Sequence, residues 1–331
     1  MNFIQEKIYV FAPAGYASGG PEALHQLAHS LKKLGKNVKM FYYGLKVVDN
    51  LVQHSNYSHY ELEYETDINK IENNNEVLLV IPETYCQILN NMKLKNTSKA
   101  IWWLSVDFFF ISEKSINKYF GLKRFIKGDL RFPSLNDIKG MSQVVNIPNS
   151  YYTLKFLKDN NLKHTKVISD YLNKKYLEES ENKLKKEDII IYNPAKNGQF
   201  LDKIIERTQN LNWIPIKGMT QEEVKALMDK AKIYIDFGFH PGRERMPREA
   251  CLAKCCLIIG KDGAARYKED MPIDDYYHFE TKDKNIEKII SVIDDCFKNY
   301  NEKFKDFSNY RDNILNAEYR FNAEVKNVFS E

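Results

Sequence analysis

Short apolar runs alternate with amphipathic stretches along most of the chain. In the first half, β-branched and aromatic runs have the length of strands, and between them apolar residues recur every three or four positions, as in helices. Strands are predicted at Lys7–Phe11, Val38–Tyr43, Val77–Ile81, Ala100–Leu104, Gln143–Ile147 and Lys166–Ser169, and helices at Pro21–Leu34 and Tyr151–Leu157. Gly35 follows the first helix, where a glycine commonly ends one.

A second alternating series follows the charged segment Glu178–Glu187, which is typical of a connector or an exposed helix. It predicts strands at Asp188–Tyr192, Asn212–Ile216, Lys232–Phe237 and Cys255–Ile259, and helices at Leu201–Thr208, Gln221–Lys230 and Arg245–Ala253. From Ile286 to Phe329 the pattern is mostly helical. Repeated β-α-β units predict parallel sheets with helices on both faces, because a crossover between parallel strands needs a helix.

The chain has 331 residues, a length typical of two domains. We predict an α/β fold of two doubly wound, Rossmann-like domains facing a central cleft, with C-terminal helices packing back. The domains are expected at 1–172 and 173–305, and a final helix at 306–331 is expected to return to the first domain. In such sheets, ligands bind beyond the carboxyl ends of the strands.

Composition limits the classes of protein. Hydrophobic residues make up 43% and charged residues 28%, as in soluble globular proteins. The net charge is +4 without a dense basic block, so nothing points to nucleic acid. No run approaches the roughly 18–20 apolar residues that span a bilayer, and the polar N-terminus has no secretory pattern. Five cysteines without framework spacing indicate reduced thiols in a cytoplasmic protein.

Metal-binding patterns are weak. His25 and His29 are four residues apart, but Gln26 stands where an HExxH motif needs glutamate, so we expect a solvated pair. The remaining candidates, Cys251, Cys255 and Cys256, include no CxxC pair and no nearby histidine, and small buried packing residues are the better interpretation. We therefore expect neither a metal ion nor a cofactor.

A glycine-containing loop follows the first strand. It reads GYASGGPE, with Gly19 and Gly20 directly before Pro21, a residue suited to the first turn of a helix. Bare backbone amides at a positive helix end suit an anion, although a plain strand-to-helix turn is the alternative. The motif is not GxGxxG, so it does not indicate a dinucleotide.

Ser105 and Asp107 follow a strand that carries two tryptophans, at the edge where a ligand is expected. Asp107 is a candidate to take a proton from a hydroxyl group, and capping of the next segment is the alternative. The apolar run Phe108–Phe110 is expected in the core or in the wall of a binding site.

The densest group of chemistry-bearing residues is the segment DFGFHPGRERMPREA. A strand ends, a Gly/Pro loop with His240 turns, and a helix opens beside Arg243 and Arg245. An arginine holds phosphate oxygens in a two-pronged contact, and Glu249, about one turn further along, can accept hydrogen bonds from ribose hydroxyls. The alternative is a solvated helix start with internal ion pairs. Because glycines precede this helix start and buried-looking strands flank it, the segment favours a binding site.

Further candidates stand at other strand ends of the second series. Lys196 follows its first strand, Lys217 its second and Gly263 its fourth. Each can face the same crevice, and the two lysines can reach a diphosphate there, although a lone lysine is by default a surface residue. Elsewhere, Lys118–Lys127 interleaves basic and aromatic residues, as a membrane-surface segment or an ordinary surface helix and turn does.

These segments resemble the GT-B-fold glycosyltransferases of the broad, group-1-like kind that includes bacterial polysaccharide and lipopolysaccharide enzymes. The stretch GGPEALHQLAHSLKKLGKNV is similar to the acceptor-side motif of that group, and PNSYYTLKFLKDNNLKHTKVISDYLN to the end of its N-terminal domain. The stretch IPIKGMTQEEVKALMDKAKIYIDFGFHPGRERMPREACLAKCCLIIG resembles its donor-binding core. The resemblance implies an acceptor-side domain at 1–172 and a nucleotide-sugar-binding domain at 173–305.

By this resemblance, Glu249 takes the place of the glutamate that holds the donor ribose, and Lys196 that of the basic residue at the diphosphate. The family's usual first glutamate, eight residues earlier, is replaced by Pro241, and Arg243 and Arg245 occupy that loop. The usual histidine of the N-terminal domain is also absent, with Ser105 and Asp107 nearest. Expected donor-binding residues are Gly19, Gly20, Lys196, Lys217, His240, Arg243, Arg245, Glu249 and Gly263, and expected catalytic residues are Asp107 and Ser105.

The implied activity is transfer of a sugar from a nucleotide-sugar donor to a saccharide or lipid-linked acceptor in cell-surface glycan synthesis. Lys196 and Arg243 or Arg245 would stabilise the departing diphosphate in place of a metal. We expect a cytoplasmic protein without nucleic-acid partners that contacts the inner membrane leaflet peripherally. The alternatives are a nucleotide-sugar epimerase of the same fold and a non-catalytic nucleotide-sugar-binding subunit.

Overall fold

The computed structural model describes residues 3–44, 52–123, 131–173 and 185–330. The chain divides into two compact units: unit 1 is Met1–Asp170 with Tyr319–Glu331, and unit 2 is Tyr171–Glu318. The change of unit therefore comes two residues before the predicted boundary. The predicted last segment, 306–331, is itself divided, because its first part belongs to unit 2 and only its second part returns to unit 1.

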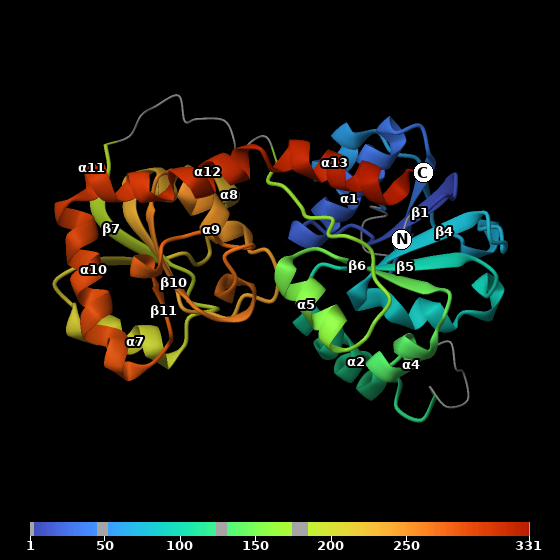
Figure 1. Ribbon diagram of the computed structural model, residues 1–331, viewed down its shortest axis with the longest axis horizontal. Helices are drawn as coiled ribbons and strands as arrows, with labels where there is room; N and C mark the ends of the chain where they lie inside the picture. Colours follow the sequence, from blue (N-terminus) through green and yellow to red (C-terminus); the bar gives the residue numbers. More distant parts are fainter. Residues whose placement is uncertain (1–2, 45–51, 124–130, 174–184, 331) are drawn as a thin grey trace. The chain divides into compact units, whose positions relative to one another are not determined.

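Unit 1 is built on a six-stranded parallel sheet with the strand order β3-β2-β1-β4-β5-β6. In Figure 1, α1 and α13 lie on one side of this sheet, and α2, α4 and α5 on the other. The elements are β1 (Lys7–Pro13), α1 (Gly19–Lys33), β2 (Asn37–Tyr43), β3 (Tyr64–Glu65), β4 (Val77–Pro82), β5 (Ser98–Trp103), α2 (Val106–Phe120), α4 (Leu135–Gly140), β6 (Val144–Pro148), α5 (Tyr151–Asp159) and α13 (Ala317–Phe329).

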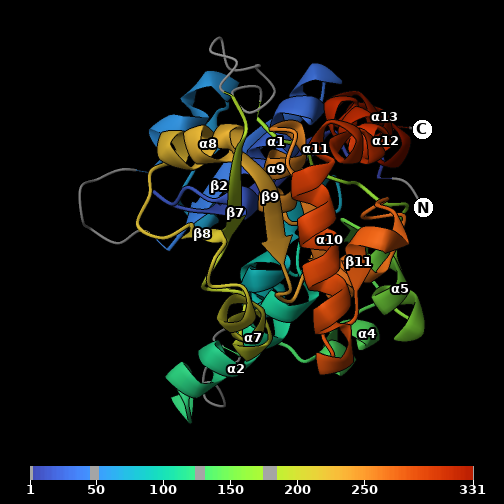
Figure 2. The same ribbon diagram turned by 90° about the vertical axis from the view of Figure 1, so that its left-hand side faces the viewer.

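Unit 2 is built on a five-stranded parallel sheet with the order β11-β10-β9-β7-β8. Figure 2 shows β7 beside β8 and β9, with α10 alongside the sheet. The elements are β7 (Glu187–Tyr192), α7 (Gln199–Arg207), β8 (Asn212–Pro215), α8 (Gln221–Lys230), β9 (Ala231–Asp236), α9 (Arg245–Leu252), β10 (Cys256–Gly260), β11 (His278–Phe279), α10 (Ile286–Lys298), α11 (Tyr300–Lys303) and α12 (Ser308–Leu315).

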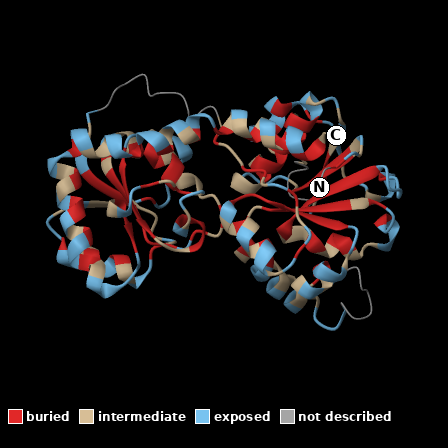
Figure 3. Cartoon of the chain, viewed as in Figure 1, coloured by how far each residue is buried: buried red, intermediate tan, exposed pale blue. Residues whose placement is uncertain are grey.

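The hydrophobic pattern explains why these segments pair as they do. All six residues of β4 and all five of β10 are buried, which is the pattern of parallel strands covered by helices on both faces. Figure 3 shows the central strands of each sheet buried, while the helices carry an exposed side. Helix α1 turns Leu24, Leu27 and Leu31 toward the core, and Gly35 follows it with φ +82°, a conformation that favours glycine. The predicted α/β fold of two parallel sheets is confirmed.

Two local predictions are wrong. Lys166–Ser169 forms no strand. The Ile168 N–H donates a hydrogen bond to the Pro148 carbonyl at 2.9 Å, as in a strand pair, but the Ile168 carbonyl accepts its hydrogen bond from the Trp102 indole N–H at 3.1 Å and not from a neighbouring strand. His25 and His29 are not a solvated pair. His25 is fully buried, with its ring nitrogens 2.6 Å from the Pro21 carbonyl and 2.7 Å from the Tyr42 hydroxyl. Burial lowers the pKa of His25 to about 4, so it is a neutral core residue.

The described part of the chain also bears on the expectations for cysteines, metals and membrane spans. All five cysteines are buried and free, as expected of packing residues. Within the described ranges, no three His, Cys, Asp or Glu side chains gather as metal ligands would, and no helix is both long and apolar enough to cross a bilayer. The predicted segments Glu178–Glu187 and Lys118–Lys127 lie partly outside the described residues.

Candidate functional site

The order of strands in unit 2 marks one place where a ligand is expected. From β7 the chain passes to β8 on one side, and it then returns to the other side of β7 to form β9. Such a reversal separates the loops that leave the carboxyl ends of β7 and β9, and open α/β sheets bind ligands at this point. The loop after β7 carries Lys196, and the loop after β9 carries His240 and Arg243. The topology thus brings together two segments that the sequence singled out separately.

The two loops are fastened to each other. The Asn197 amide donates to the Asn193 carbonyl at 2.9 Å, and its oxygen accepts a hydrogen bond from the Phe237 N–H at 2.6 Å. A Cβ atom on Gly238 would lie 2.7 Å from Cβ of Lys196 and 2.8 Å from the Lys196 carbonyl oxygen, so only glycine fits there. Lys196 is therefore held at a defined position against the β9 loop.

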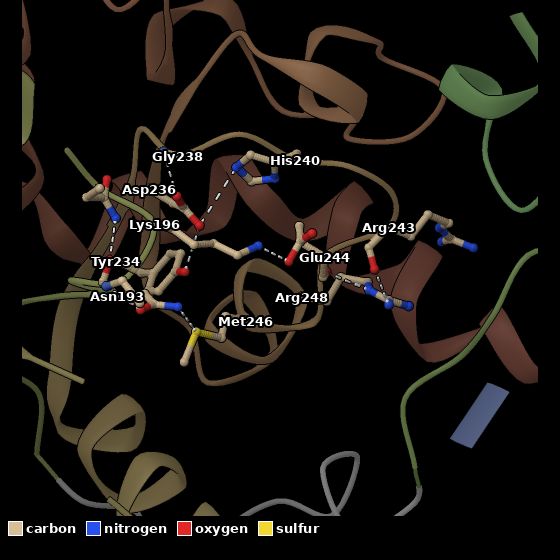
Figure 4. Close-up of polar contacts among 12 residues, drawn as sticks. Asn193, Lys196, Tyr234, Asp236, Gly238, His240, Arg243, Glu244, Met246 and Arg248 are labelled. Carbon is tan, nitrogen blue, oxygen red and sulfur yellow. Dashed lines mark hydrogen bonds and ion pairs between the residues drawn. The ribbon is translucent and has the colours of Figure 1, made fainter. Parts of the chain in front are cut away.

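Carboxylates already engage two of the cations at this point. Lys196 forms an ion pair with Glu244, the N-cap residue of α9, and the pair is partly exposed (Figure 4). Arg245 Nε lies 3.4 Å from Glu249 Oε1, one helical turn further along α9. The site therefore holds its own counter-charges, and an anionic ligand at Lys196 meets the negative charge of Glu244. The sequence-based alternative of internal ion pairs is thus part of the observed geometry.

His240 lies in a buried polar group behind this ion pair. The Tyr234 hydroxyl donates to Asp236 Oδ2 at 3.0 Å, the Gly238 N–H donates to Asp236 Oδ1 at 2.9 Å, and His240 Nε2 is 3.7 Å from Asp236 Oδ2. Burial lowers the pKa of His240, and the nearby Asp236 charge opposes this shift only in part. His240 is therefore a neutral imidazole at pH 7, and Figure 4 shows its ring turned toward Asp236.

Gly263 supports the same loop from the carboxyl end of β10. Its φ is +55°, and a Cβ atom there would lie 2.1 Å from the His240 carbonyl oxygen. That carbonyl accepts a hydrogen bond from the Ala264 N–H at 2.7 Å. Gly263 thus allows backbone to pack directly against backbone, and its role in the structure is to place His240.

Arg248 is a functional candidate that was absent from the predicted site residues. It is 2% exposed, and it donates from Nε to the Glu244 carbonyl at 3.0 Å and from Nη2 to the Arg243 carbonyl at 2.9 Å. With His240 and Tyr310, it lines a small pocket beneath the loop. The signal in the sequence was an arginine four residues after Glu244, the N-cap of the helix, a spacing that lets its side chain reach back to the carbonyls there.

Lys217 stands apart from this group. It is exposed beyond the end of β8, the outer strand of the sheet, so it lies one strand away from the reversal between β7 and β9.

The equivalent reversal in unit 1 lies between β1 and β4. Gly19 and Gly20 are the first residues of α1, directly after the loop that leaves β1, and Ser18 before them is fixed by the Tyr57 hydroxyl. A Cβ atom on Gly20 would meet Leu104 Cδ1 at 3.7 Å, which places this loop beside the end of β5. These glycines belong to unit 1, whereas the other expected donor-binding residues belong to unit 2.

Ser105 and Asp107 begin helix α2. The Ser105 hydroxyl is the N-cap, accepting a hydrogen bond from the Phe108 N–H at 3.2 Å, and Asp107 lies in the first turn. The sequence left helix capping open as an alternative role for Asp107. In the structure, Ser105 caps the helix.

Glu83 is the residue in unit 1 that the sequence reasoning missed. It directly follows β4, is 2% exposed, and accepts a hydrogen bond from the Leu104 N–H at 2.9 Å. Burial raises the pKa of its carboxyl to about 8, although backbone hydrogen bonds from Leu104 and Ser105 oppose the shift. The feature of the sequence that could have indicated Glu83 is its position immediately after the wholly apolar strand β4, which lies at the reversal of strand order. A buried carboxyl at this edge is typical of functional sites.

Comparison with known proteins identifies the fold. No family model and no curated protein matches the sequence. Among solved structures, HepE of Anabaena in complex with UDP-glucose matches 97% of this chain and 98% of its own, with a TM-score of 0.64 at 10% identity. Sucrose-phosphate synthase of Thermosynechococcus elongatus matches 98% and 95%, with a TM-score of 0.55 at 11% identity. A glycosyltransferase of Rickettsia africae matches 98% and 94%, with a TM-score of 0.50 at 16% identity.

At this level of identity the likeness is one of fold, and it covers both units. Together with the two parallel sheets, each with a reversal of strand order, it confirms the fold expected from the sequence. The chain has the GT-B glycosyltransferase fold.

Proposed function

We propose that the protein is a glycosyltransferase that moves a sugar from a nucleotide-sugar donor to a saccharide or lipid-linked acceptor in cell-surface glycan synthesis. The observation that carries this proposal is Lys196 at the strand reversal of unit 2, held by Glu244 at the N-cap of α9, with Arg243 directly before that cap and Arg245 directly after it. The fold supports it, since HepE, with the same fold, binds UDP-glucose.

The donor diphosphate would bind where Lys196 and the two arginines meet the amino end of α9. Cations and a positive helix end stabilise the negative charge that develops as the glycosidic bond breaks. Because Glu244 holds Lys196 before binding, the diphosphate would compete with this carboxylate for the ammonium group. Glu249 would accept hydrogen bonds from the ribose hydroxyls after release from Arg245, and the neutral His240 ring can donate one hydrogen bond to the donor.

Unit 1 would supply the acceptor side. The amides of Gly19 and Gly20 at the start of α1 suit an anionic group, and Asp107 is the candidate base for the acceptor hydroxyl. Ser105, the second candidate catalytic residue, also caps α2, and Glu83 accepts a hydrogen bond from the Leu104 N–H in the same turn. Lys217 would play at most a lesser part in donor binding, because it stands one strand further out.

We further propose that the reaction needs no metal, that the protein works in the cytoplasm, and that it contacts the inner membrane leaflet peripherally. Lysine and arginine side chains supply the positive charge that a divalent cation supplies elsewhere. Turnover is therefore expected to be the same with EDTA as with added magnesium.

Donor binding tests the proposal, with UDP, uridine and a panel of nucleotide sugars titrated by calorimetry. Lys196→Gln should weaken UDP binding about ten- to a hundredfold, the cost of one charge-assisted hydrogen bond, and leave uridine binding unchanged. Glu244→Gln should tighten UDP binding about two- to fivefold, because it removes the carboxylate that competes for Lys196.

The matched control is Lys232, which forms an ion pair with Asp188 at 2.5 Å between the same two strands, β9 and β7, at the opposite edge of the sheet. Lys232→Gln should leave UDP affinity unchanged. Equal losses in the Lys196 and Lys232 variants would refute the site. Conversion of a nucleotide sugar without acceptor would identify an epimerase, and binding without any turnover a non-catalytic subunit.

A further inference from the structure

Helix α2 carries an apolar stripe on the side that faces away from unit 1. Phe108, Ile111 and Tyr119 are 51%, 55% and 83% exposed, and Leu122, just past the helix end, is 81% exposed. Phe108, Ile111, Ser115 and Tyr119 follow one another at three, four and four residues, which places them on one helix face, and Gly121, with φ +46°, ends the helix before Leu122. In Figures 1 and 2, α2 lies at the margin of unit 1.

The opposite side of α2 packs against the rest of unit 1, and the residues of the stripe take no part in this packing. Phe109 is fully buried, with its ring centroid 4.8 Å from that of Trp103 and 5.3 Å from that of Phe132. Asn117 adds two hydrogen bonds to the Phe132 backbone, at 3.0 and 3.1 Å. The exposed aromatic and aliphatic residues are therefore not needed to hold the helix against unit 1. Exposure of these apolar side chains to water is unfavourable, and a binding partner would cover them.

Positive charge accompanies the stripe. Lys114 and Lys118 lie one turn apart along its flank, and Lys123 follows Leu122, all three exposed and without an ion pair among the described residues. Glu113 is placed on the side turned toward the unit, where burial raises the pKa of its carboxyl. Asp107, which directly precedes Phe108 in the first turn, is half-buried. The combination of exposed Phe, Ile, Tyr and Leu with flanking lysines is typical of helices that lie in the headgroup region of a membrane.

Size also favours a lipid surface over a second protein chain. A 15-residue helix is roughly 22 Å long and about 10 Å wide, so the stripe covers on the order of 200 Å². A stable protein interface needs about 800 Å² from each partner. Binding to a bilayer needs no such minimum area, because each inserted side chain and each lysine adds separately to the free energy of membrane binding.

From this geometry we propose that the exposed face of α2 is a membrane-docking surface, in which Phe108, Ile111, Tyr119 and Leu122 enter a leaflet and Lys114, Lys118 and Lys123 contact anionic headgroups. This surface deepens the lipid-linked acceptor part of the proposed function. It is tested by vesicle binding alone, without donor or turnover, so it can fail or hold separately from the activity.

The experiment is co-sedimentation of the full chain with vesicles of phosphatidylcholine alone and of phosphatidylcholine mixed with phosphatidylglycerol. The protein should bind the anionic vesicles, and high salt should weaken the binding. Lys114→Gln with Lys118→Gln should lower the partition coefficient about 25-fold, at roughly fivefold for each lysine near the surface. Phe108→Ser with Tyr119→Ser should lower it at least about tenfold.

Matched controls come from elsewhere on the surface. Tyr319 on α13 is 80% exposed, and Lys284 and Lys298 are exposed lysines of unit 2. Tyr319→Ser and the Lys284→Gln, Lys298→Gln double variant should bind vesicles as the wild type does. No binding to anionic vesicles, or equal losses in the control variants, would overturn the proposal. So would a concentration-dependent dimer that Tyr119→Ser abolishes, because the occupant would then be a second copy of the chain.

Discussion

Three buried residues of unit 1 have pKa values that differ from those of exposed groups, and burial is the common cause. His25 has a pKa lowered to about 4, Lys99 one lowered to about 8, and Glu83 one raised to about 8. Lys99 is satisfied by the Leu94 and Thr97 carbonyls, at 2.6 and 3.1 Å. The buried His25 and Lys99 thus serve packing, whereas Glu83 stands at the sheet edge where a ligand is expected.

Glu83 should make stability depend on pH in a recognisable way. Its pKa is about 8 in the folded chain against an ordinary value of 4.5, so the folded state binds more protons between these values. The free energy of unfolding contributed by Glu83 therefore falls as the pH rises from about 4.5 to 8. Glu83→Gln removes this dependence and keeps an oxygen for the Leu104 N–H. Relative to wild type, the variant should gain stability on the order of a few kcal/mol over that window.

The measurement is urea unfolding of both proteins at several pH values. His25 and Lys99 titrate identically in both, so the difference between the two curves isolates Glu83. The control is Glu76→Gln, at an exposed glutamate one residue before β4. For this variant, the difference in unfolding free energy from wild type should not change with pH. A flat difference for Glu83→Gln as well would mean that its carboxyl is ionised in the folded protein.

At the scale of elements, the backbone of the β9–α9 loop depends on glycines at close approaches. Gly263→Ala would place a methyl group 2.1 Å from the His240 carbonyl oxygen, so the loop must move. We expect the variant to lose several kcal/mol of stability or to lose UDP affinity at least about tenfold, because His240 and Arg243 shift with the loop. Thermal unfolding and calorimetry measure the two effects.

Gly218 provides the comparison for this variant. Its φ is +67°, close to that of Gly263, but a Cβ atom there would meet nothing within 4 Å. Gly218→Ala should therefore cost only about 1 kcal/mol from backbone strain. Similar losses in both variants would mean that positive φ, and not the contact with His240, is what Gly263 provides.

The elements themselves were largely predictable, because periodicity marks buried faces. The strands at 7–11, 77–81 and 188–192 were placed within two residues of β1, β4 and β7. Lys166–Ser169 was wrongly predicted as a strand. Its β-branched residues favour a strand, but the sequence cannot show that the Ile168 carbonyl accepts a hydrogen bond from the Trp102 side chain. Helix α2 was missed because its exposed stripe interrupts the pattern of a single buried face.

The candidate site was predictable in its residue types and not in its pairings. Strand ends and loop glycines pointed to Lys196, His240 and Gly263, and the sheet topology places all three around one loop. That Lys196 would be held by Glu244 could not be inferred, because the two are 48 residues apart and meet only through the return of the chain to β9. Arg248 and Glu83 were missed for the same reason, since their roles rest on burial and on contacts with backbone groups.

At the scale of the whole molecule, the last helix ties the end of the chain to unit 1. Glu324 accepts hydrogen bonds from the Ser169 N–H and hydroxyl, both at 2.7 Å, and the Ser30 hydroxyl donates to Asn322 at 2.7 Å. The Phe3 N–H also donates to the Val328 carbonyl at 2.8 Å. Unit 1 is thus completed only when the C-terminal residues are present, although most of its core comes from the first half of the chain.

Two buried phenylalanines on either side of the boundary test whether the units are energetically separate. Phe321 on α13 is fully buried and belongs to unit 1, whereas Phe307, just before α12, is 1% exposed and belongs to unit 2. Each change to alanine should cost about 3–5 kcal/mol locally, through lost burial and a cavity. Native-state hydrogen exchange should show Phe321→Ala lowering protection in β1 and β4, and Phe307→Ala in β9 and β10. If either variant lowers protection equally in both sheets, the units unfold as one, and α13 then couples them in place of completing unit 1 alone.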